Sequence, residues 1–141
     1  MSRSLLKLFS RFHVALYRAS GGRLGGRVRN APVLLLTTTG RKTGEQRTIP
    51  LLYLEDAERY VVIASVGGAP KHPAWYLNLL ASPAATVQVG SRRVAVTAET
   101  APPAERERLW PLAVQMYPGY DDYRAKTDRE IPVVVLAPAA I

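Results

Sequence analysis

Residues 37–47 read Thr-Thr-Thr-Gly-Arg-Lys-Thr-Gly-Glu-Gln-Arg, and this stretch determines which fold the sequence predicts. An apolar run at residues 33–36 precedes it, and a second apolar run at residues 49–54 follows it. Gly40 and Gly44 bracket the centre of the stretch, which is the pattern of a tight turn between two strands. The sequence therefore predicts an antiparallel hairpin with a basic turn.

The side chains of this turn suit an anionic group. Arg41, Lys42 and Arg47 supply three cations, and arginine offers a rigid bidentate fork to phosphate or carboxylate oxygens. Glycine permits positive φ, so consecutive backbone N–H groups of the turn can face one anion. The motif alone fits an anion-binding loop and a solvated basic hairpin equally well.

The positive charge of the chain is concentrated in its first third. The net charge is +8, yet residues 1–47 hold ten Lys/Arg against the single acid Glu45, whereas the remainder holds nine bases and ten acids. Such a segment attracts anionic partners. A nucleotide-like cofactor, an anionic lipid surface and a nucleic acid all meet that description.

The N-terminal segment is predicted to be a basic amphipathic helix. Apolar side chains recur at helical spacing over residues 4–18, among basic ones. Such a helix can lie on a membrane surface or pack on its own domain, and no segment is apolar enough to cross a bilayer or to serve as a signal peptide. A flexible Gly/Arg connector follows. We therefore divide the chain into a helix and linker, residues 1–29, and a main domain, residues 30–141.

The remaining pattern predicts an α+β fold. Strands are expected at about residues 33–39, 46–54, 59–65, 86–89, 92–97 and 131–136, with helices over 74–80 and 105–116 and an aromatic, turn-rich segment over 117–123. The long spacing of parallel βαβ units is missing. A mainly antiparallel barrel with an N-terminal helix and short inserted helices fits this order.

Missing residue types exclude several kinds of active site. The chain has no cysteine, which excludes disulfides and thiolate chemistry. Its two histidines, His13 and His72, are far apart, so no metal site is expected, although His72 beside a Gly/Pro loop is a candidate for ligand contact. No Walker A, Gly-x-Gly-x-x-Gly or Gly-x-Ser-x-Gly motif is present. We therefore expect a bound cofactor to supply the chemistry.

An aromatic set completes the picture. Its members are Trp75, Tyr76, Tyr117, Tyr120 and Tyr123. Aromatic faces stack on planar rings, and tyrosine hydroxyls donate hydrogen bonds or protons. Together with the basic turn, these residues suggest a flavin-like molecule with an anionic tail. The alternative is that the aromatic residues serve only as core anchors.

Five motifs occur in order: residues 34–44 followed by Arg47 and Pro50-Leu51; Ala64-Ser65; Lys71 and Pro73; Trp-Tyr-Leu-Asn-Leu at 75–79; and Met-Tyr-Pro-Gly-Tyr at 116–120. From about residue 30 to residue 138 they make the chain resemble the deazaflavin-dependent nitroreductase family, which includes quinone reductases. The resemblance implies a split β-barrel related to flavin-mononucleotide-binding proteins. It also implies coenzyme F-420, a reduced 8-hydroxy-5-deazaflavin with a phosphate and a polyglutamate tail.

The resemblance further implies site residues. The cofactor wall would comprise Arg41, Lys42, Thr43, Arg47, Thr48, Ile49, Pro50, Ile63, Ala64, Ser65, Val66, Ala74, Trp75, Tyr76, Leu77 and Asn78. Tyr117 and Tyr120 would orient or protonate an acceptor, and Tyr123 and Leu52 would border it. Val66 stands where some members carry Lys, and Leu52 where some carry Tyr, so the preferred acceptor stays open.

The implied activity is hydride transfer from the reduced cofactor to a quinone, an activated alkene or a nitroaromatic compound. A flavin-mononucleotide oxidoreductase on the same barrel, a cofactor carrier without catalysis and a nucleic-acid-binding module remain the alternatives. We expect no nucleic-acid partner, because the aromatic residues are not interleaved with the basic segment. A cytoplasmic location is expected, with possible peripheral contact at the inner membrane face through residues 4–18. The sequence indicates no oligomeric state.

Overall fold

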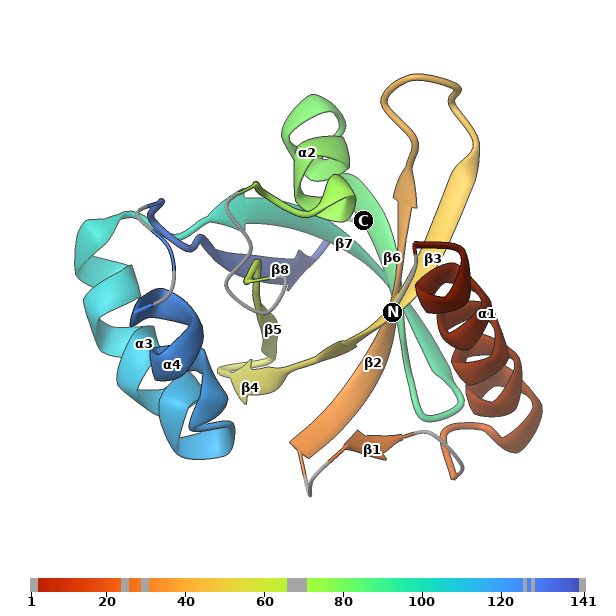
Figure 1. Ribbon diagram of the computed structural model, residues 1–141, viewed down its shortest axis with the longest axis horizontal. Helices are drawn as coiled ribbons and strands as arrows, with labels where there is room; N and C mark the ends of the chain where they lie inside the picture. Colours follow the sequence, from red (N-terminus) through yellow and green to blue (C-terminus); the bar gives the residue numbers. More distant parts are fainter. Residues whose placement is uncertain are drawn as a thin grey trace.

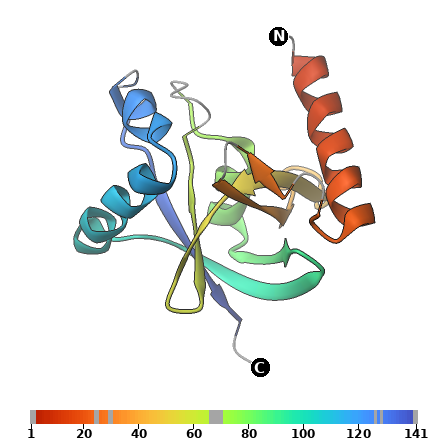
Figure 2. The same ribbon diagram turned by 90° about the horizontal axis from the view of Figure 1, so that it is seen from below.

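The computed structural model describes residues 3–23, 26–28, 31–65, 71–125, 127 and 129–139, with the side chains of residues 3–10, 27 and 28 excepted. Four helices and eight strands occur in these ranges (Figures 1 and 2). They are α1 (Arg3–Ser20), β1 (Arg27–Val28), β2 (Ala31–Thr39), β3 (Gln46–Leu52), β4 (Leu54–Asp56), β5 (Arg59–Ile63), α2 (Ala74–Ala81), β6 (Ala84–Val89), β7 (Arg92–Thr100), α3 (Pro103–Met116), α4 (Gly119–Ala125) and β8 (Val133–Pro138).

The strands form one antiparallel sheet that closes on itself. Hydrogen-bonded neighbours follow the order β1-β2-β6-β7-β8-β5-β4, and β3 pairs with β2. β3 therefore lies at one end of the sheet and β4 at the other, yet only Tyr53 separates them in the chain. The run from β3 through Tyr53 to β4 thus supplies both ends of the sheet. The predicted antiparallel split barrel and its α+β class are confirmed.

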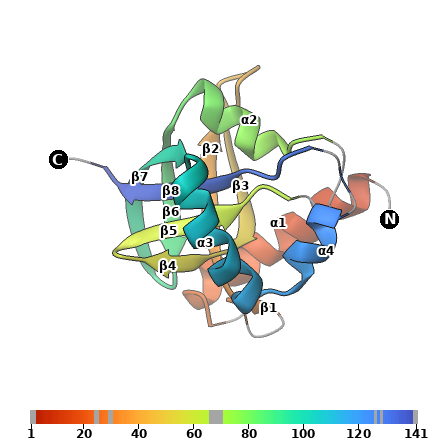
Figure 3. The same ribbon diagram turned by 90° about the vertical axis from the view of Figure 1, so that its left-hand side faces the viewer.

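Side chains of β2 alternate between two cores, as the period of two in a strand requires. Leu34 and Leu36 point into the barrel, where they pack with Val87 and Leu136 among others. The intervening Leu35 packs on the outside. A third cluster joins β5 and β8 to α3 and α4, and Figure 3 shows these two helices together on one side of the strands. β2 is therefore buried on both faces.

The C-terminal half of α1 is packed on the barrel. Val14 and Tyr17 are buried against Val33 and Leu35. The Tyr17 hydroxyl accepts a hydrogen bond from the backbone N–H of Gly90 at 2.7 Å and donates one to the carbonyl oxygen of Gln88 at 3.2 Å. Packing of the helix on its own domain is thereby confirmed for this half. No helix in the described part of the chain has the length and apolar character needed to cross a membrane.

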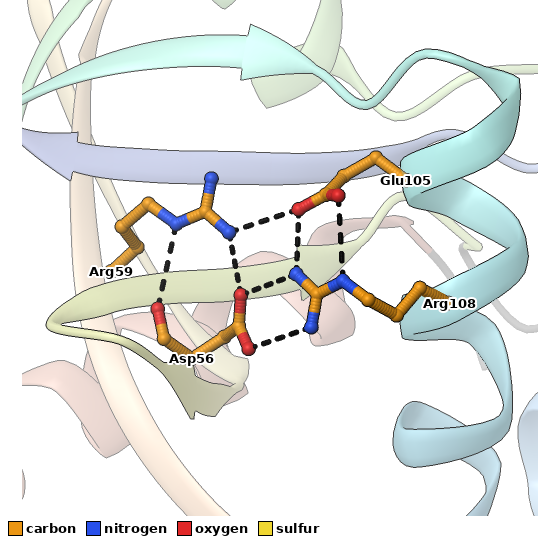
Figure 4. A network of polar contacts seen from close by, with 4 residues as sticks. All are labelled: Asp56, Arg59, Glu105 and Arg108. Atoms are coloured by element: carbon orange, nitrogen blue, oxygen red, sulfur yellow. Dashed lines mark hydrogen bonds and ion pairs between the residues drawn. The ribbon is translucent and has the colours of Figure 1, made fainter.

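A four-residue ionic network joins the β4–β5 hairpin to α3 (Figure 4). Arg59 and Arg108 both contact the carboxylate of Asp56, at 2.5 and 2.7 Å. Both also contact the carboxylate of Glu105, at 2.9 and 2.6 Å. Hydrogen bonds from Arg108, and then from Arg59, hold the pKa of Asp56 far below its ordinary value. The network holds α3 against the β4–β5 hairpin, and α4 packs in turn in the cluster that includes α3.

Two local predictions are wrong. Residues 27–28, predicted as part of a flexible connector, pair as β1 with residues 31–32. The segment 117–123, predicted as turn-rich, contains the start of helix α4 at Gly119. Gly119 suggested a turn, but a Cβ at this position would lie 2.6 Å from Cε2 of Tyr117. The ring of Tyr117 therefore packs closely against this glycine at the start of α4.

Candidate active site

One large cleft, of about 1330 Å³, brings together residues from both ends of the chain. Its walls come from α1, the β2–β3 hairpin, the end of β5, the start of α2 and the tyrosines around α4. The lining residues are Arg11, Val14, Ala15, Arg18, Thr38, Gly40, Arg41, Lys42, Thr43, Gln46, Arg47, Thr48, Ile49, Pro50, Leu51, Leu52, Ile63, Ser65, Pro73, Ala74, Trp75, Asn78, Tyr117, Tyr120 and Tyr123.

The basic turn forms one end of this cleft. The N–H of Gly44 donates to the carbonyl oxygen of Gly40 at 2.8 Å, and the N–H of Gly40 donates to the carbonyl oxygen of Glu45 at 2.7 Å. Gly44 has φ +76°, where glycine is favoured. A Cβ on Gly40 would lie 3.1 Å from the carbonyl oxygen of Glu45. The closed turn holds the exposed side chains of Arg41 and Lys42 at the cleft.

Asn78 of α2 holds the Gly40–Gly44 turn through hydrogen bonds to Arg41. This buried amide accepts two hydrogen bonds from Arg41, one from its backbone N–H at 3.2 Å and one from its guanidinium at 3.0 Å. It also donates to the hydroxyl of Thr38 at 3.1 Å. Asn78 was predicted as part of the cofactor wall, and it does line the cleft. Its contacts show that it also positions Arg41.

A second basic wall comes from α1, and sequence reasoning missed it. Arg11 and Arg18 line the cleft, and Arg18 donates to the hydroxyl of Thr48 at 3.2 Å. Thr48 in turn shares a 2.7 Å hydrogen bond with Thr37. The seven-residue spacing of the two arginines, which places them on one face of a helix, was the available signal. The sequence alone does not show that this face of α1 is directed toward the cleft.

Three tyrosines close the other end of the cleft. The ring centroids of Tyr117 and Tyr120 lie 5.0 Å apart, and those of Tyr120 and Tyr123 lie 6.2 Å apart. The hydroxyls of Tyr117 and Tyr123 share a hydrogen bond of 3.0 Å. Tyr120 is 4% exposed. Burial, followed by the neighbouring Tyr117 and Tyr123, raises the pKa of Tyr120 well above its ordinary value, so its hydroxyl stays neutral.

Apolar side chains join the two ends. Ile49, Pro50, Leu51 and Leu52 of β3 line the cleft along one strand, and Trp75 faces it from α2. Trp75 is buried at 8% exposure and packs edge-on against the ring of Tyr76. An elongated ligand with an acidic end and a planar end would meet matching surfaces along this path.

Three predicted cofactor residues do not line the cleft, namely Ala64, Tyr76 and Leu77. A fourth, Val66, lies outside the described residues. Alternation explains Ala64, because its neighbours Ile63 and Ser65 face the cleft and Ala64 packs inside the barrel. The Tyr76 hydroxyl instead shares a 2.9 Å hydrogen bond with Thr100. The alternation of side chains along a strand and the residue spacing on a helix were the signals that could have identified these residues as facing away from the cleft.

His72 also lies away from the cleft walls. Its Nδ1 is 3.0 Å from the guanidinium of Arg129, which donates to the carbonyl oxygen of Ser65 at 2.8 Å. Burial and this arginine lower the pKa of His72. Among the described residues, no group of three or more metal-ligating side chains occurs.

The residues of the cleft fit a deazaflavin coenzyme. Arginine and lysine side chains suit its phosphate and carboxylates, and a Cβ on Gly44, in the same turn, would meet no atom within 4 Å. The apolar strand and the aromatic residues suit a planar ring system.

Known proteins resemble the chain over most of its length. The model of the family described as F420H(2)-dependent quinone reductase matches residues 9–138. The F420H(2)-dependent quinone reductase Rv1261c of Mycobacterium tuberculosis (strain ATCC 25618 / H37Rv) is 44% identical over 130 residues, which cover 89% of this chain and 87% of that protein.

Solved structures agree with this match. A structure described as an F420-H2 dependent reductase (FDR-A) is 46% identical, with a TM-score of 0.70, and the match covers 74% of this chain and 93% of that one. A second structure, described as a domain-swapped dimer, is 40% identical, with a TM-score of 0.72 and coverage of 89% and 94%. A FAD-binding protein from Mesorhizobium loti, 15% identical with a TM-score of 0.55 and coverage of 77% and 79%, shares the fold alone.

The antiparallel barrel defines a protein of the FMN-binding split-barrel fold class. The family match and the relative at 44% identity make the assignment specific. The chain belongs to the F420H(2)-dependent quinone reductase family. It is an oxidoreductase, and its cofactor is coenzyme F-420. The predictions of family, enzyme class and cofactor are confirmed at this level.

Proposed function

We propose that this chain reduces a quinone at the tyrosine end of the cleft. Coenzyme F-420, when bound in its reduced form, supplies a hydride to the acceptor. The acceptor then needs one proton to become a hydroquinone. One observation carries the proposal: the basic β2–β3 turn and the three tyrosines at 117, 120 and 123 line the same cleft.

The basic turn would provide the affinity for the coenzyme. Arg41 and Lys42 are exposed at the cleft and offer charge-assisted hydrogen bonds to phosphate oxygens. Thr43 adds a hydroxyl, although this group already accepts a hydrogen bond from the N–H of Glu45 at 3.2 Å. Arg47 lies 3.2 Å from the carboxylate of Glu45, so part of its charge is already paired. Arg41 and Lys42 are therefore the main anion ligands in this proposal.

The tyrosines would orient the acceptor. Tyr120 keeps its proton through the physiological range because burial raises its pKa, so its hydroxyl can donate a hydrogen bond to a quinone oxygen. Tyr117 and Tyr123 form a bonded pair that holds the neighbouring wall in place. Leu52 adds an apolar contact on the same side. Holding the acceptor in near-attack position would contribute most of the rate.

The exposed Phe12 of α1 supports one finer possibility, contact with a membrane surface where apolar quinones reside. This side chain is 62% exposed on a basic helix, and exposed aromatic side chains on such helices favour the interface. Sedimentation with vesicles of phosphatidylglycerol tests this contact, and a Phe12→Ala variant that sediments as well as the wild type rejects it.

A titration followed by an acceptor panel tests the main proposal. The purified chain is first titrated with oxidised coenzyme F-420 and, separately, with flavin mononucleotide. The reduced coenzyme is then mixed with menadione, a nitroimidazole and an activated alkene, and its reoxidation is followed by absorbance. We expect tight binding of the deazaflavin alone and fastest turnover with the quinone. Tighter binding of flavin mononucleotide, or no catalysis of quinone reduction, would reject the proposal.

A further inference from the structure

Helix α1 presents a separate face to the cleft. Arg11, Ala15 and Arg18 follow one another at intervals of four and three residues, which places them on one stripe of a helix, and all three line the cleft. Val14 and Tyr17 lie on the adjacent stripe and are buried against the barrel. The helix is therefore oriented by its apolar stripe, and its basic stripe faces the ligand space as a consequence.

This orientation is held by more than apolar packing. Tyr17, 1% exposed, is hydrogen-bonded to both Gln88 and Gly90 of the β6–β7 hairpin. A Cβ on Gly22, just beyond the helix, would lie 2.8 Å from the Cα of Gly90. The end of α1 is thus closely fitted to a distant part of the barrel. Because Tyr17 anchors the C-terminal end of α1 on the barrel, the positions of Arg11 and Arg18 on this helix are fixed relative to the cleft.

The charges of the cleft are unbalanced. Among the described residues, five cations line it, namely Arg11, Arg18, Arg41, Lys42 and Arg47, and no aspartate or glutamate does. Within the described part of the chain, only Arg47 of these five has an ion pair. Arg18 has a neutral partner, the hydroxyl of Thr48. Cations gathered without counter-charge raise the local potential and attract a polyanion.

We infer that Arg11 and Arg18 form a second cationic wall that binds carboxylates of the acidic tail of the coenzyme, while the β2–β3 turn binds its phosphate. This inference rests on the proposed function. It makes α1 part of the coenzyme site, although the sequence alone divides residues 1–29 from the binding domain. The tail of the bound coenzyme then lies between α1 and β3, where Thr48 contacts Arg18.

Two ligands separate the tail from the ring in the test. One is oxidised coenzyme F-420 with its glutamates, and the other is 8-hydroxy-5-deazariboflavin, which lacks both phosphate and tail. We expect Arg11→Ala with Arg18→Ala to weaken binding of the tailed coenzyme at least tenfold in a fluorescence titration, with less than a twofold effect on the tailless ring. The affinity of the wild type should also fall more steeply with added salt than that of the variant.

A matched control removes the same charge elsewhere. Arg92 and Arg93 are exposed on β7 and do not line the cleft, so Arg92→Ala with Arg93→Ala should leave both affinities within twofold of the wild type. If the Arg11/Arg18 variant unfolds, Arg11→Glu replaces it. Arg11 is an exposed side chain, and reversing its charge should weaken the tailed coenzyme by at least the same factor.

The outcomes are distinguishable. A wild type that binds neither ligand rejects the proposed function and this inference with it. A wild type that binds the tailed coenzyme, together with a folded Arg11/Arg18 variant of equal affinity, rejects this inference alone. Loss of binding to phosphatidylglycerol vesicles without any change in coenzyme affinity also rejects it, and assigns the two arginines to a lipid surface.

Discussion

The two ends of the cleft are built in opposite ways. The basic end is a short exposed turn whose side chains reach into solvent, and a single buried amide, Asn78, fixes it. At the other end, the ring of Tyr120 is buried between Tyr117 and Tyr123, and α4 packs on α3. Exposed cations suit attraction of a charged ligand, whereas buried rings suit precise orientation. The comparison suggests that affinity and turnover can be changed separately.

Removing the two exposed cations of the turn should have the largest effect. Arg41→Ala with Lys42→Ala should weaken coenzyme binding at least tenfold, because charge-assisted hydrogen bonds contribute about 1.5–3 kcal/mol each. Turnover at saturating coenzyme should change less than threefold. Calorimetry and steady-state rates measure the two quantities, and an unchanged affinity in a folded variant would contradict the assignment of the turn.

The support beneath the turn should matter next. Asn78→Ala should lower the free energy of unfolding by about 2 kcal/mol, since it removes the hydrogen bonds to Arg41 and to the buried hydroxyl of Thr38. We also expect the coenzyme affinity to fall by a few-fold. Urea denaturation and titration measure these effects. Leu77→Ala is the neighbouring control, because Leu77 does not line the cleft; equal losses of affinity in both variants would argue against a positioning role for Asn78.

At the aromatic end, Tyr120→Phe should reduce turnover by about fivefold, the equivalent of one hydrogen bond of about 1 kcal/mol, with coenzyme affinity within twofold. Burial raises the pKa of Tyr120, so its hydroxyl is protonated both below and above neutrality. The ratio of wild-type to variant rates should therefore be flat between about pH 6 and pH 9. A ratio that falls toward one in this range would mean that Tyr120 ionises there.

The smallest effect should come from the network behind the aromatic end. Arg108 and Arg59 lower the pKa of Asp56 in the folded chain, so the folded state releases this proton more readily than the unfolded state. The resulting stability is present above the ordinary pKa and is lost as the pH falls through the lowered one. We expect wild type to exceed Asp56→Asn in urea midpoint at pH 7, and the difference to shrink below about pH 4. A difference that grows in acid would contradict this sign.

Local patterns predicted the parts of the molecule that local forces build. The basic hairpin followed from the glycine positions, and the barrel followed from the strand order. Helix α4 was not predicted, because Pro118 and Gly119 resemble a turn, whereas in the structure the ring of Tyr117 packs closely against Gly119. That contact can be seen only when the side chains are in place.

The site shows the same division. The sequence pointed to Arg41 and Lys42, whose role depends on a turn of five residues. It could not place Arg18 opposite Thr48, thirty residues away, because the sequence of α1 alone does not reveal which strand it will cover. It also included Ala64, although the strand period assigns its side chain to the barrel interior. Arg18 thus reaches the cleft through a contact that is distant in the sequence, and Ala64 is turned from it by the alternation of side chains.

The run from β3 through Tyr53 to β4 also has a consequence for how the molecule opens. One continuous backbone supplies both edge strands of the sheet. A single peptide-bond cut near Tyr53 would therefore remove the covalent link between these edges and leave an open sheet. Backbone amides on both sides of Tyr53 should accordingly exchange with deuterium as one cooperative unit.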